Sequence, residues 1–200
     1  MRDPIIKQIL EIFRQLKVVR PKDLAARGIP PVYLQRLCQS GEVIRASRGI
    51  YHTKKHEPSS RHLLALMAKR IPKAVVCLLS ALELHDLTTH SPHKIWIAIH
   101  KRSRRPVDSD LPIRIVRFSE TSLTAGVEEV SIEGIQVKVT SVAKTIADCF
   151  KFRRKIGEDI AIEALRDGLK KRKCTRDEIW KQSKICRVAN VIRPYMESIG

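Results

Sequence analysis

The sequence lacks the features that mark membrane-spanning, exported and disulfide-stabilised proteins. The longest comparable apolar stretch, AVVCLLSAL at residues 74–82, is too short to cross a bilayer. The N-terminus has no apolar core of the kind that a signal peptide contains. The five cysteines are an odd number and are scattered along the chain. We therefore expect reduced thiols and a cytoplasmic protein that has no membrane partner.

Acidic residues are scarce relative to basic ones. The chain has 39 Lys and Arg against 21 Asp and Glu, which gives a formal net charge of +18. Residues 1–57 hold 12 basic and 5 acidic side chains, residues 58–140 hold 12 and 8, and residues 141–200 hold 15 and 8. The excess therefore lies mainly in the two ends. An electrostatic field of this sign favours binding to nucleic acid. From charge alone, the alternative is a ribosome-associated protein or simply a soluble basic protein.

The first 57 residues predict a winged helix-turn-helix. Apolar residues at helical spacing indicate a helix over residues 3–17. Pro21 and Pro31 open two further helices, which end at Gly28 and Gly41. Two short strands then flank a turn, with the sequences EVIRA at 42–46 and GIYH at 49–52.

The third helix and the hairpin carry the residues that we predict to contact DNA. Leu34, Leu37 and Cys38 are expected to face inward. The amide and guanidinium groups left outside suit base edges in a major groove, and the hairpin cations suit phosphates or a minor groove. The alternative is a protein–protein adaptor, a role that small winged helices also serve. The predicted DNA-binding residues are Lys22, Tyr33, Gln35, Arg36, Gln39, Arg45, Ser47 and Arg48.

Residues 58–200 predict a second domain, after a polar, turn-rich linker at 54–61. Residues 58–140 contain four β-rich stretches, and residues 141–200 are helical to the end. The expected fold class is α+β, with an N-terminal winged helix-turn-helix, then a small mixed sheet packed with a C-terminal set of helices. We expect strands at 94–99, 113–118, 127–133 and 135–140, and helices at 141–152, 157–171, 175–185 and 188–199.

Three local predictions accompany this organisation. Ser80 and Glu83 have the spacing of a capping box, and so do Thr175 and Glu178. The last helix is expected to be kinked or broken before Pro194. A helix over 61–70 is expected to turn four residues inward, namely Leu63, Leu64, Met67 and Ala68.

Patterns for metal binding and nucleophilic catalysis are weak. The chain has no CxxC pair, no P-loop and no GxSxG motif. His85, His90 and His93 lie close in sequence with Cys77 nearby, but a metal site needs ligands at paired spacing on an ordered frame. Two of these histidines lie in a turn sequence. We therefore expect loop or core histidines, with no metal and no cofactor.

One arrangement suggests a nuclease that has lost its chemistry. Asp108 and Asp110 precede one predicted strand, and the sequence QVK lies on a later one. Nucleases of the restriction-endonuclease type use an acid and a nearby acid-x-Lys pair to hold Mg²⁺. Gln136 stands where that acid would be, two residues before Lys138, and a neutral amide is a weak Mg²⁺ ligand. We therefore expect no catalytic residue and no enzyme activity.

Four stretches resemble the AbiEi-type antitoxins, the antitoxin half of bacterial type IV toxin–antitoxin systems. LAARGIP with GEVIRASRGIYH forms the front end. VVCLLSALELHDLTTHSPHKIWIAI, AKTIADCFKFRRKIGEDIAIEALRDGL and ICRVANVIRPYMES follow in the same order as in the family. The resemblance spans nearly the whole chain, and its AKTIADCF…EALRD part is the most distinctive.

The resemblance implies a function. In that family the winged helix binds inverted repeats upstream of its own operon and represses it. Such operons are linked to abortive infection against phage. The C-terminal region opposes a nucleotidyltransferase-like toxin that is encoded in the same operon. The expected partners are therefore operator DNA and such a toxin. The alternatives are a solitary winged-helix transcription factor and a degenerate restriction-endonuclease-like DNA enzyme.

The positive charge of the last 60 residues suggests a second contact with DNA or with a partner. The basic residues gather at two predicted helix junctions, where they either extend the phosphate contacts or complement helix C-termini in solvent. The residues concerned are Lys151, Arg153, Arg154, Lys170, Lys171, Arg172 and Lys173.

Overall fold

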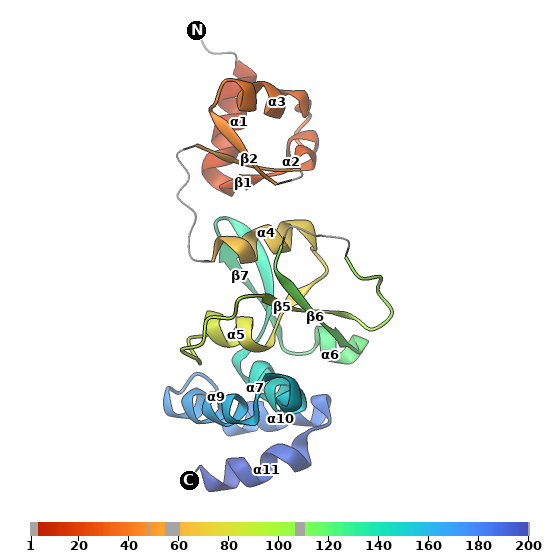
Figure 1. Cartoon of the computed structure of the whole chain (residues 1–200), viewed down its shortest axis with the longest axis vertical. Helices are drawn as coiled ribbons and strands as arrows, with labels where there is room; N and C mark the ends of the chain where they lie inside the picture. Colours follow the sequence, from red (N-terminus) through yellow and green to blue (C-terminus); the bar gives the residue numbers. More distant parts are fainter. Residues whose placement is uncertain (1–3, 48, 55–60, 107–110, 200) are drawn as a thin grey trace. The chain divides into compact units, whose positions relative to one another are not determined.

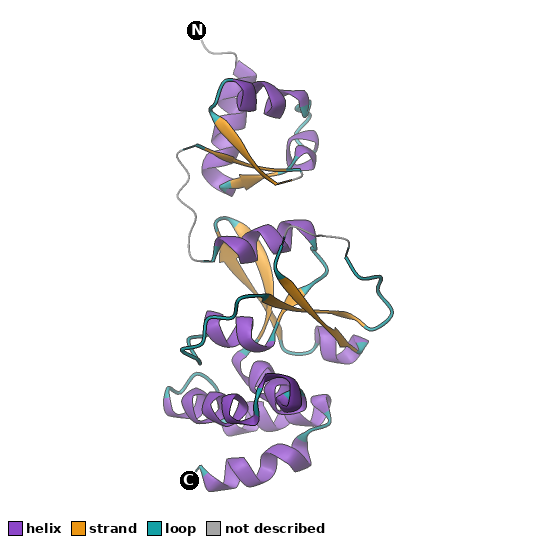
Figure 2. Cartoon of the chain, viewed as in Figure 1, coloured by secondary structure: helices purple, strands orange, loops and turns teal. Residues whose placement is uncertain are grey.

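The computed structural model describes residues 4–47, 49–54, 61–106 and 111–199 (Figure 1). The chain forms two compact units, Met1–Pro72 with Ser131–Gln136, and Lys73–Val130 with Val137–Gly200. Strands occur in both units, and every element described after residue 140 is a helix (Figure 2). The predicted α+β class is confirmed. The predicted linker falls largely on residues 55–60, outside the described ranges, so the domain boundary at 57 stays a prediction.

The first unit contains the predicted helices and hairpin, together with one strand that was not predicted. That strand, β1, pairs antiparallel with β3, which also pairs with β2, so the sheet has the order β1-β3-β2. Its two valines were too short a run to indicate a strand. The elements are α1 (Pro4–Leu16), β1 (Val18–Val19), α2 (Pro21–Ala25), α3 (Val32–Gln39), β2 (Val43–Ser47), β3 (Ile50–Thr53) and α4 (His62–Arg70).

One apolar core holds the helices of the winged helix-turn-helix together. Ile9, Ile12 and Phe13 are buried from α1, because their spacing places them on one helical face. Leu34 and Leu37 of α3 pack into the same core, as predicted. The opposite face of α3 is therefore fixed in the outward direction.

Helix α4 is placed as predicted, but one inward residue was wrong. Leu64 and Met67 are buried, whereas the side chain of Leu63 is 45% exposed. Leu66 is buried instead. The helix is therefore buried over more of its circumference than hydrophobic spacing indicated, because Ala65 and Lys69 are buried as well.

The second unit is built around a mixed five-stranded sheet of order β6-β5-β4-β8-β7. The β4–β5 pair is antiparallel, and the β4–β8 and β5–β6 pairs are parallel. The strands are β4 (Val75–Val76), β5 (Ile95–His100), β6 (Ile113–Phe118), β7 (Val127–Ile132) and β8 (Ile135–Thr140), and the helices are α5 (Leu78–Leu84), α6 (Glu120–Thr124), α7 (Val142–Lys151), α8 (Arg153–Ile156), α9 (Glu158–Lys170), α10 (Arg176–Cys186) and α11 (Ala189–Ser198).

The predictions for Ser80 and for a break before Pro194 are wrong, and the one for Thr175 is confirmed. Helix α5 begins at Leu78, so Ser80 lies inside it, and its hydroxyl oxygen accepts a hydrogen bond from the Trp96 N–H at 3.0 Å. Helix α11 continues through Pro194, so the predicted break does not occur, and a kink at this position stays a prediction. The predicted capping box at Thr175 is confirmed, because its hydroxyl oxygen accepts from the Glu178 N–H at 3.2 Å.

Helix α7 is the buried centre of the second unit and packs against α5, α9 and α10. All eight residues from 143 to 150 are buried, including the charged residues Lys144 and Asp148. Their Nζ and Oδ2 atoms lie 2.5 Å apart, and neither side chain is exposed. The Cys186 thiol also donates to Asp148 Oδ1 at 3.2 Å. Burial of these charges is tolerated because each has an opposite partner one helical turn away.

The turn between β7 and β8 belongs to the first unit. Its residues Glu133 and Gly134 both have positive φ, as a two-residue type I′ hairpin requires. The backbone oxygen of Gln15 lies so close to Gly134 that a Cβ atom there would collide with it. Glu133 Oε2 also lies 2.8 Å from Nδ1 of His62, the first residue of α4. The first unit is therefore assembled from two separate stretches of sequence.

Candidate nucleic-acid interface

Helix α3 presents one polar stripe to solvent. Gln35, Arg36 and Gln39 are exposed, and Val32 shares their side of the helix. At about 100° of rotation per residue, these four positions span an arc of only about 100°. Leu34 and Leu37 lie on the opposite side and are buried. The packing of the core therefore orients amide and guanidinium groups outward in a single row.

Tyr33 lies at the border of this stripe and is half-buried. The Arg36 guanidinium lies over the Tyr33 ring, 5.2 Å from its centroid. A cation held against an aromatic face loses less side-chain freedom when it forms further hydrogen bonds. Tyr33 therefore contacts the Arg36 guanidinium from the border of the stripe and does not lie at its centre.

The hairpin that follows α3 brings a further cation close to the helix. Arg45 is exposed on β2 and lies opposite Tyr51 of β3. Burial raises the pKa of the Cys38 thiol in α3, and the positive charge of Arg45 partly opposes this shift, so the two groups are neighbours. The ladder is irregular between Arg45 and Ser47. The side chain of Ser47 and the whole of Arg48 lie outside the described part of the chain.

Helix α2 contributes Lys22, which is exposed. The next residue, Asp23, is used inside the fold. Its Oδ2 accepts a hydrogen bond from the Arg20 N–H at 2.8 Å and pairs with the Lys69 ammonium of α4. Burial lowers the pKa of Lys69, and the hydrogen bond with Asp23 opposes that shift. This pair ties α2 to α4, a connection that the sequence did not indicate.

The predicted flanking cations divide into two groups. Three are engaged within the second unit: Arg153 donates to the Phe150 carbonyl at 2.9 Å, Lys171 pairs with Asp167 at 2.6 Å, and Lys173 donates to the carbonyl of His85. These three act in part as structural side chains. The other four are exposed, namely Lys151, Arg154, Lys170 and Arg172.

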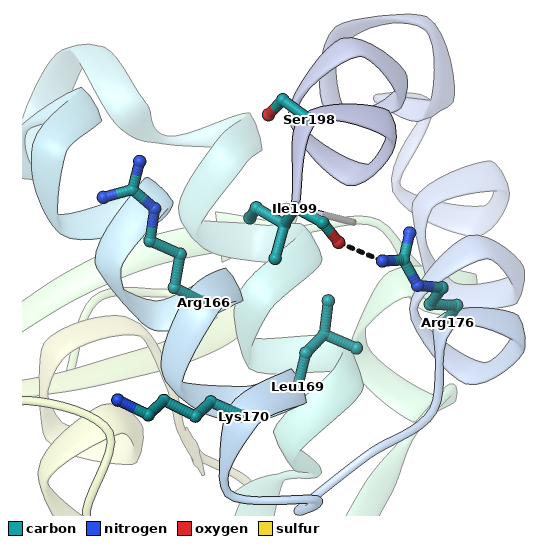
Figure 3. Close-up of a pocket in the computed structure, with 6 residues that line it drawn as sticks. All are labelled: Arg166, Leu169, Lys170, Arg176, Ser198 and Ile199. Atoms are coloured by element: carbon teal, nitrogen blue, oxygen red, sulfur yellow. Dashed lines mark hydrogen bonds between the residues drawn. The ribbon is translucent and has the colours of Figure 1, made fainter.

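Lys170 borders a hollow of about 650 Å³ at α9, α10 and the end of α11. Arg166 and Lys170 both project from α9, one helical turn apart, in Figure 3. Arg176 also lines the hollow, but its guanidinium donates to the carbonyl of Ile199. The sequence prediction missed Arg166, because it lies within the predicted helix rather than at a junction.

A second cationic surface was also missed. Seven of the twelve basic residues of 58–140 lie between residues 94 and 117, a density that the net charge of the longer segment concealed. Arg114 lies 4.4 Å from the Trp96 ring centroid, and Arg117 donates to the carbonyls of Lys101 and Ser103, each at 2.8 Å. Beside the edge strand β6 is a hollow of about 370 Å³, lined by Lys94, Arg105, Ile113, Arg114, Ile115 and Arg117.

The three histidines do not form a metal centre among the residues that the structure describes. His85 Nε2 lies 2.7 Å from the carbonyl oxygen of Thr140, whereas His90 and His93 are exposed. Gln136 is exposed on β8. Asp108 and Asp110 lie outside the described ranges. Within those ranges, no three His, Cys, Asp or Glu side chains come together as a metal ion requires.

The winged helix matches a family of known regulators. Residues 7–52 match the family model described as "Transcriptional regulator, AbiEi antitoxin". The matched segment runs from α1 to β3 and includes the whole exposed stripe of α3. The resemblance that the sequence suggested is confirmed over this segment. No curated protein sequence matches the chain.

A solved structure supports the fold of the whole chain. The chain is similar to the crystal structure of the RV2827C protein from Mycobacterium tuberculosis, with a TM-score of 0.60 and 13% sequence identity. The alignment covers 100% of this chain and 78% of that chain. At this identity the likeness shows the fold alone.

No helix of the described residues is both long and apolar enough to span a membrane.

Proposed function

We propose that the protein is the antitoxin of a type IV toxin–antitoxin system, and that it represses its own operon by binding operator DNA through the winged helix. The observation that carries this proposal is the stripe of α3, where Gln35, Arg36 and Gln39 are exposed beside the cation Arg45. The family model matched by residues 7–52 supports a regulatory role. The net charge of +18 supplies the attraction to phosphates.

In this proposal the stripe contacts base edges and the hairpin contacts the backbone. Glutamine pairs well with adenine, and arginine pairs well with guanine, in the major groove. Arg45 and Arg48 of the hairpin and Lys22 of α2 contact phosphates, which position the protein without selecting a sequence. The second unit opposes a nucleotidyltransferase-like toxin from the same operon, as in the family that the chain resembles.

The test is a footprint of the full chain on the promoter of its own operon, followed by variants of the two kinds of contact. Arg36→Ala should cost about 1–3 kcal/mol of binding free energy and relax the preference at one base pair. Arg45→Ala should weaken all duplexes alike, and lower the slope of log K against log[salt] by about 1. If both variants lose affinity independently of sequence, α3 does not select bases.

The antitoxin half of the proposal needs a separate test. Co-expression with the adjacent gene should relieve toxicity, and the relief should persist in Arg36→Ala, because neutralisation is assigned to the second unit. A protected operator without a toxic neighbouring gene would instead identify a solitary transcription factor.

The exposed cations of the second unit extend the phosphate contacts to DNA that flanks the operator. The double variant Lys170→Ala/Arg172→Ala should lower the salt slope by about 2, because each phosphate contact contributes about 0.9. Lys181→Ala/Lys184→Ala removes the same charge from exposed positions on α10 and is the matched control. Equal slopes for the two double variants would show that only overall charge matters.

A further inference from the structure

Val32 is the first residue of α3 and the most exposed large apolar side chain among the described residues, at 48%. The other two exposed at a similar level are Ile44 on β2 and Leu63 on α4. A single exposed aliphatic side chain is common on protein surfaces. Val32 differs from the other two because it lies within the stripe of α3 that the proposed function places against base edges.

The position of Val32 in the stripe is fixed by helical geometry. Gln35 and Arg36 follow it by three and four residues, so their side chains are its direct neighbours on the helix surface. The N-terminal residues of a recognition helix are those that reach base edges in helix-turn-helix proteins. Val32 therefore stands at the end of α3 that enters the groove, beside the polar groups proposed to select bases.

The conformation of Val32 is also restricted. The preceding turn is formed by Pro30 and Pro31, whose carbonyls accept hydrogen bonds from the N–H groups of Tyr33 at 3.3 Å and Leu34 at 3.0 Å. A β-branched side chain in a helix has one strongly preferred rotamer. The rotamer preference alone therefore holds the two methyl groups of Val32 in one direction, and no contact with a neighbouring side chain is needed. A fixed direction suits a selective contact.

We propose that Val32 contacts the 5-methyl group of a thymine, and so makes one position of the operator selective for thymine. Valine has no polar side-chain atom, so it cannot form a hydrogen bond with a base. The thymine methyl is the apolar group on the base edges of the major groove. This inference rests on the proposed function, because it requires that α3 lies in the groove.

The experiment uses duplexes selected by the full chain from a random DNA pool. Each thymine of the selected site is replaced in turn by uracil, which lacks only the methyl group. The wild type should lose about fourfold in affinity at one position, the amount expected for removing one buried methyl group. Val32→Ala should bind more weakly and show no further loss when that thymine becomes uracil.

Two further variants keep the result interpretable. Ile44→Ala shortens a similarly exposed apolar side chain in the same unit, and it should show the full uracil loss. Val32→Thr keeps one γ-methyl and the β-branched shape, and should retain part of the loss. Equal uracil losses in the wild type and Val32→Ala would overturn the inference, as would a wild type that is indifferent to every uracil. A wild type that selects no sequence would instead overturn the proposed function itself, and the inference with it.

Discussion

The buried ion pair of α7, between Lys144 and Asp148, allows the stability cost of removing one of its charges to be predicted. Asp148→Asn leaves the Lys144 ammonium buried and without a counter-charge. Its remaining neighbours are the Ser122 hydroxyl at 3.4 Å and the Phe118 ring, whose centroid is 4.6 Å away. Removing one member of a buried pair costs about 3–5 kcal/mol, against a typical total stability of about 5–15 kcal/mol. We expect Asp148→Asn to lower the free energy of unfolding by that amount.

The double variant Lys144→Met/Asp148→Asn tests whether the charge is the cause. Methionine fills a similar volume, and asparagine keeps an oxygen that can accept from the Cys186 thiol. Because neither residue carries a charge, the double variant should recover most of the loss and unfold within about 1–2 kcal/mol of the wild type. The two single variants should therefore be strongly non-additive.

The chain also provides a matched control. Asp167 and Lys171 have the same four-residue spacing and lie 2.6 Å apart, but their side chains are 31% and 45% exposed. Asp167→Asn should cost about 0.5 kcal/mol or less, because solvent screens an exposed pair. Urea unfolding followed by circular dichroism measures all of these values. Equal costs for Asp148→Asn and Asp167→Asn would refute the argument that burial sets the strength of the pair.

Two further predictions concern alkaline pH and the hairpin turn. Burial raises the pKa of Cys186 to about 12 and that of Cys149 well above its ordinary value, so the unfolded chain loses these protons before the folded chain does. The free energy of unfolding should therefore fall between pH 9 and 11, by up to about 1.4 kcal/mol per pH unit for each such thiol. In Cys149→Ala, urea unfolding should give a shallower slope of this free energy against pH. Gly134→Ala should lower the stability by more than Gly28→Ala does. Both glycines have the same left-handed backbone strain, but an added methyl group at Gly28 has nothing within 4 Å, whereas at Gly134 it meets the backbone oxygen of Gln15. Equal losses in thermal unfolding would contradict this close approach of Gln15.

Much of the fold could be predicted because its signals are local. Proline and glycine bounded α2 and α3, the spacing of apolar residues placed α1, and β-branched alternation placed β6 and β8. The errors occurred where tertiary contacts decide. Ser80 has the spacing of a cap, but Cys77 precedes the helix and Trp96 uses the Ser80 hydroxyl. The helix continues at Pro194, because a single missing hydrogen bond does not outweigh the packing of Ile192 and Met196.

The candidate site was predictable in part for the same reason. The outward row of α3 follows from its buried leucines, so Gln35 and Arg36 could be placed from spacing alone. Val32 was passed over because an apolar residue is ordinarily assigned to the core. The pair of Lys144 and Asp148 could not be recognised, since charges at this spacing usually indicate a solvent-facing helix. Net charges summed over long segments likewise concealed the cations between residues 94 and 117.

Because the first unit is built from two separate stretches of sequence, its parts are synthesised at different times. The apolar core of the winged helix uses residues up to Tyr51, and α4 is complete at Arg70. Glu133 and Gly134, which complete the unit, are translated 63 and 64 residues after that helix. At a rate of about 5–20 residues per second, the gap lasts about 3–13 seconds. For that interval the nascent chain contains the sequence of helix α3 and its core, while the first unit still lacks its last segment.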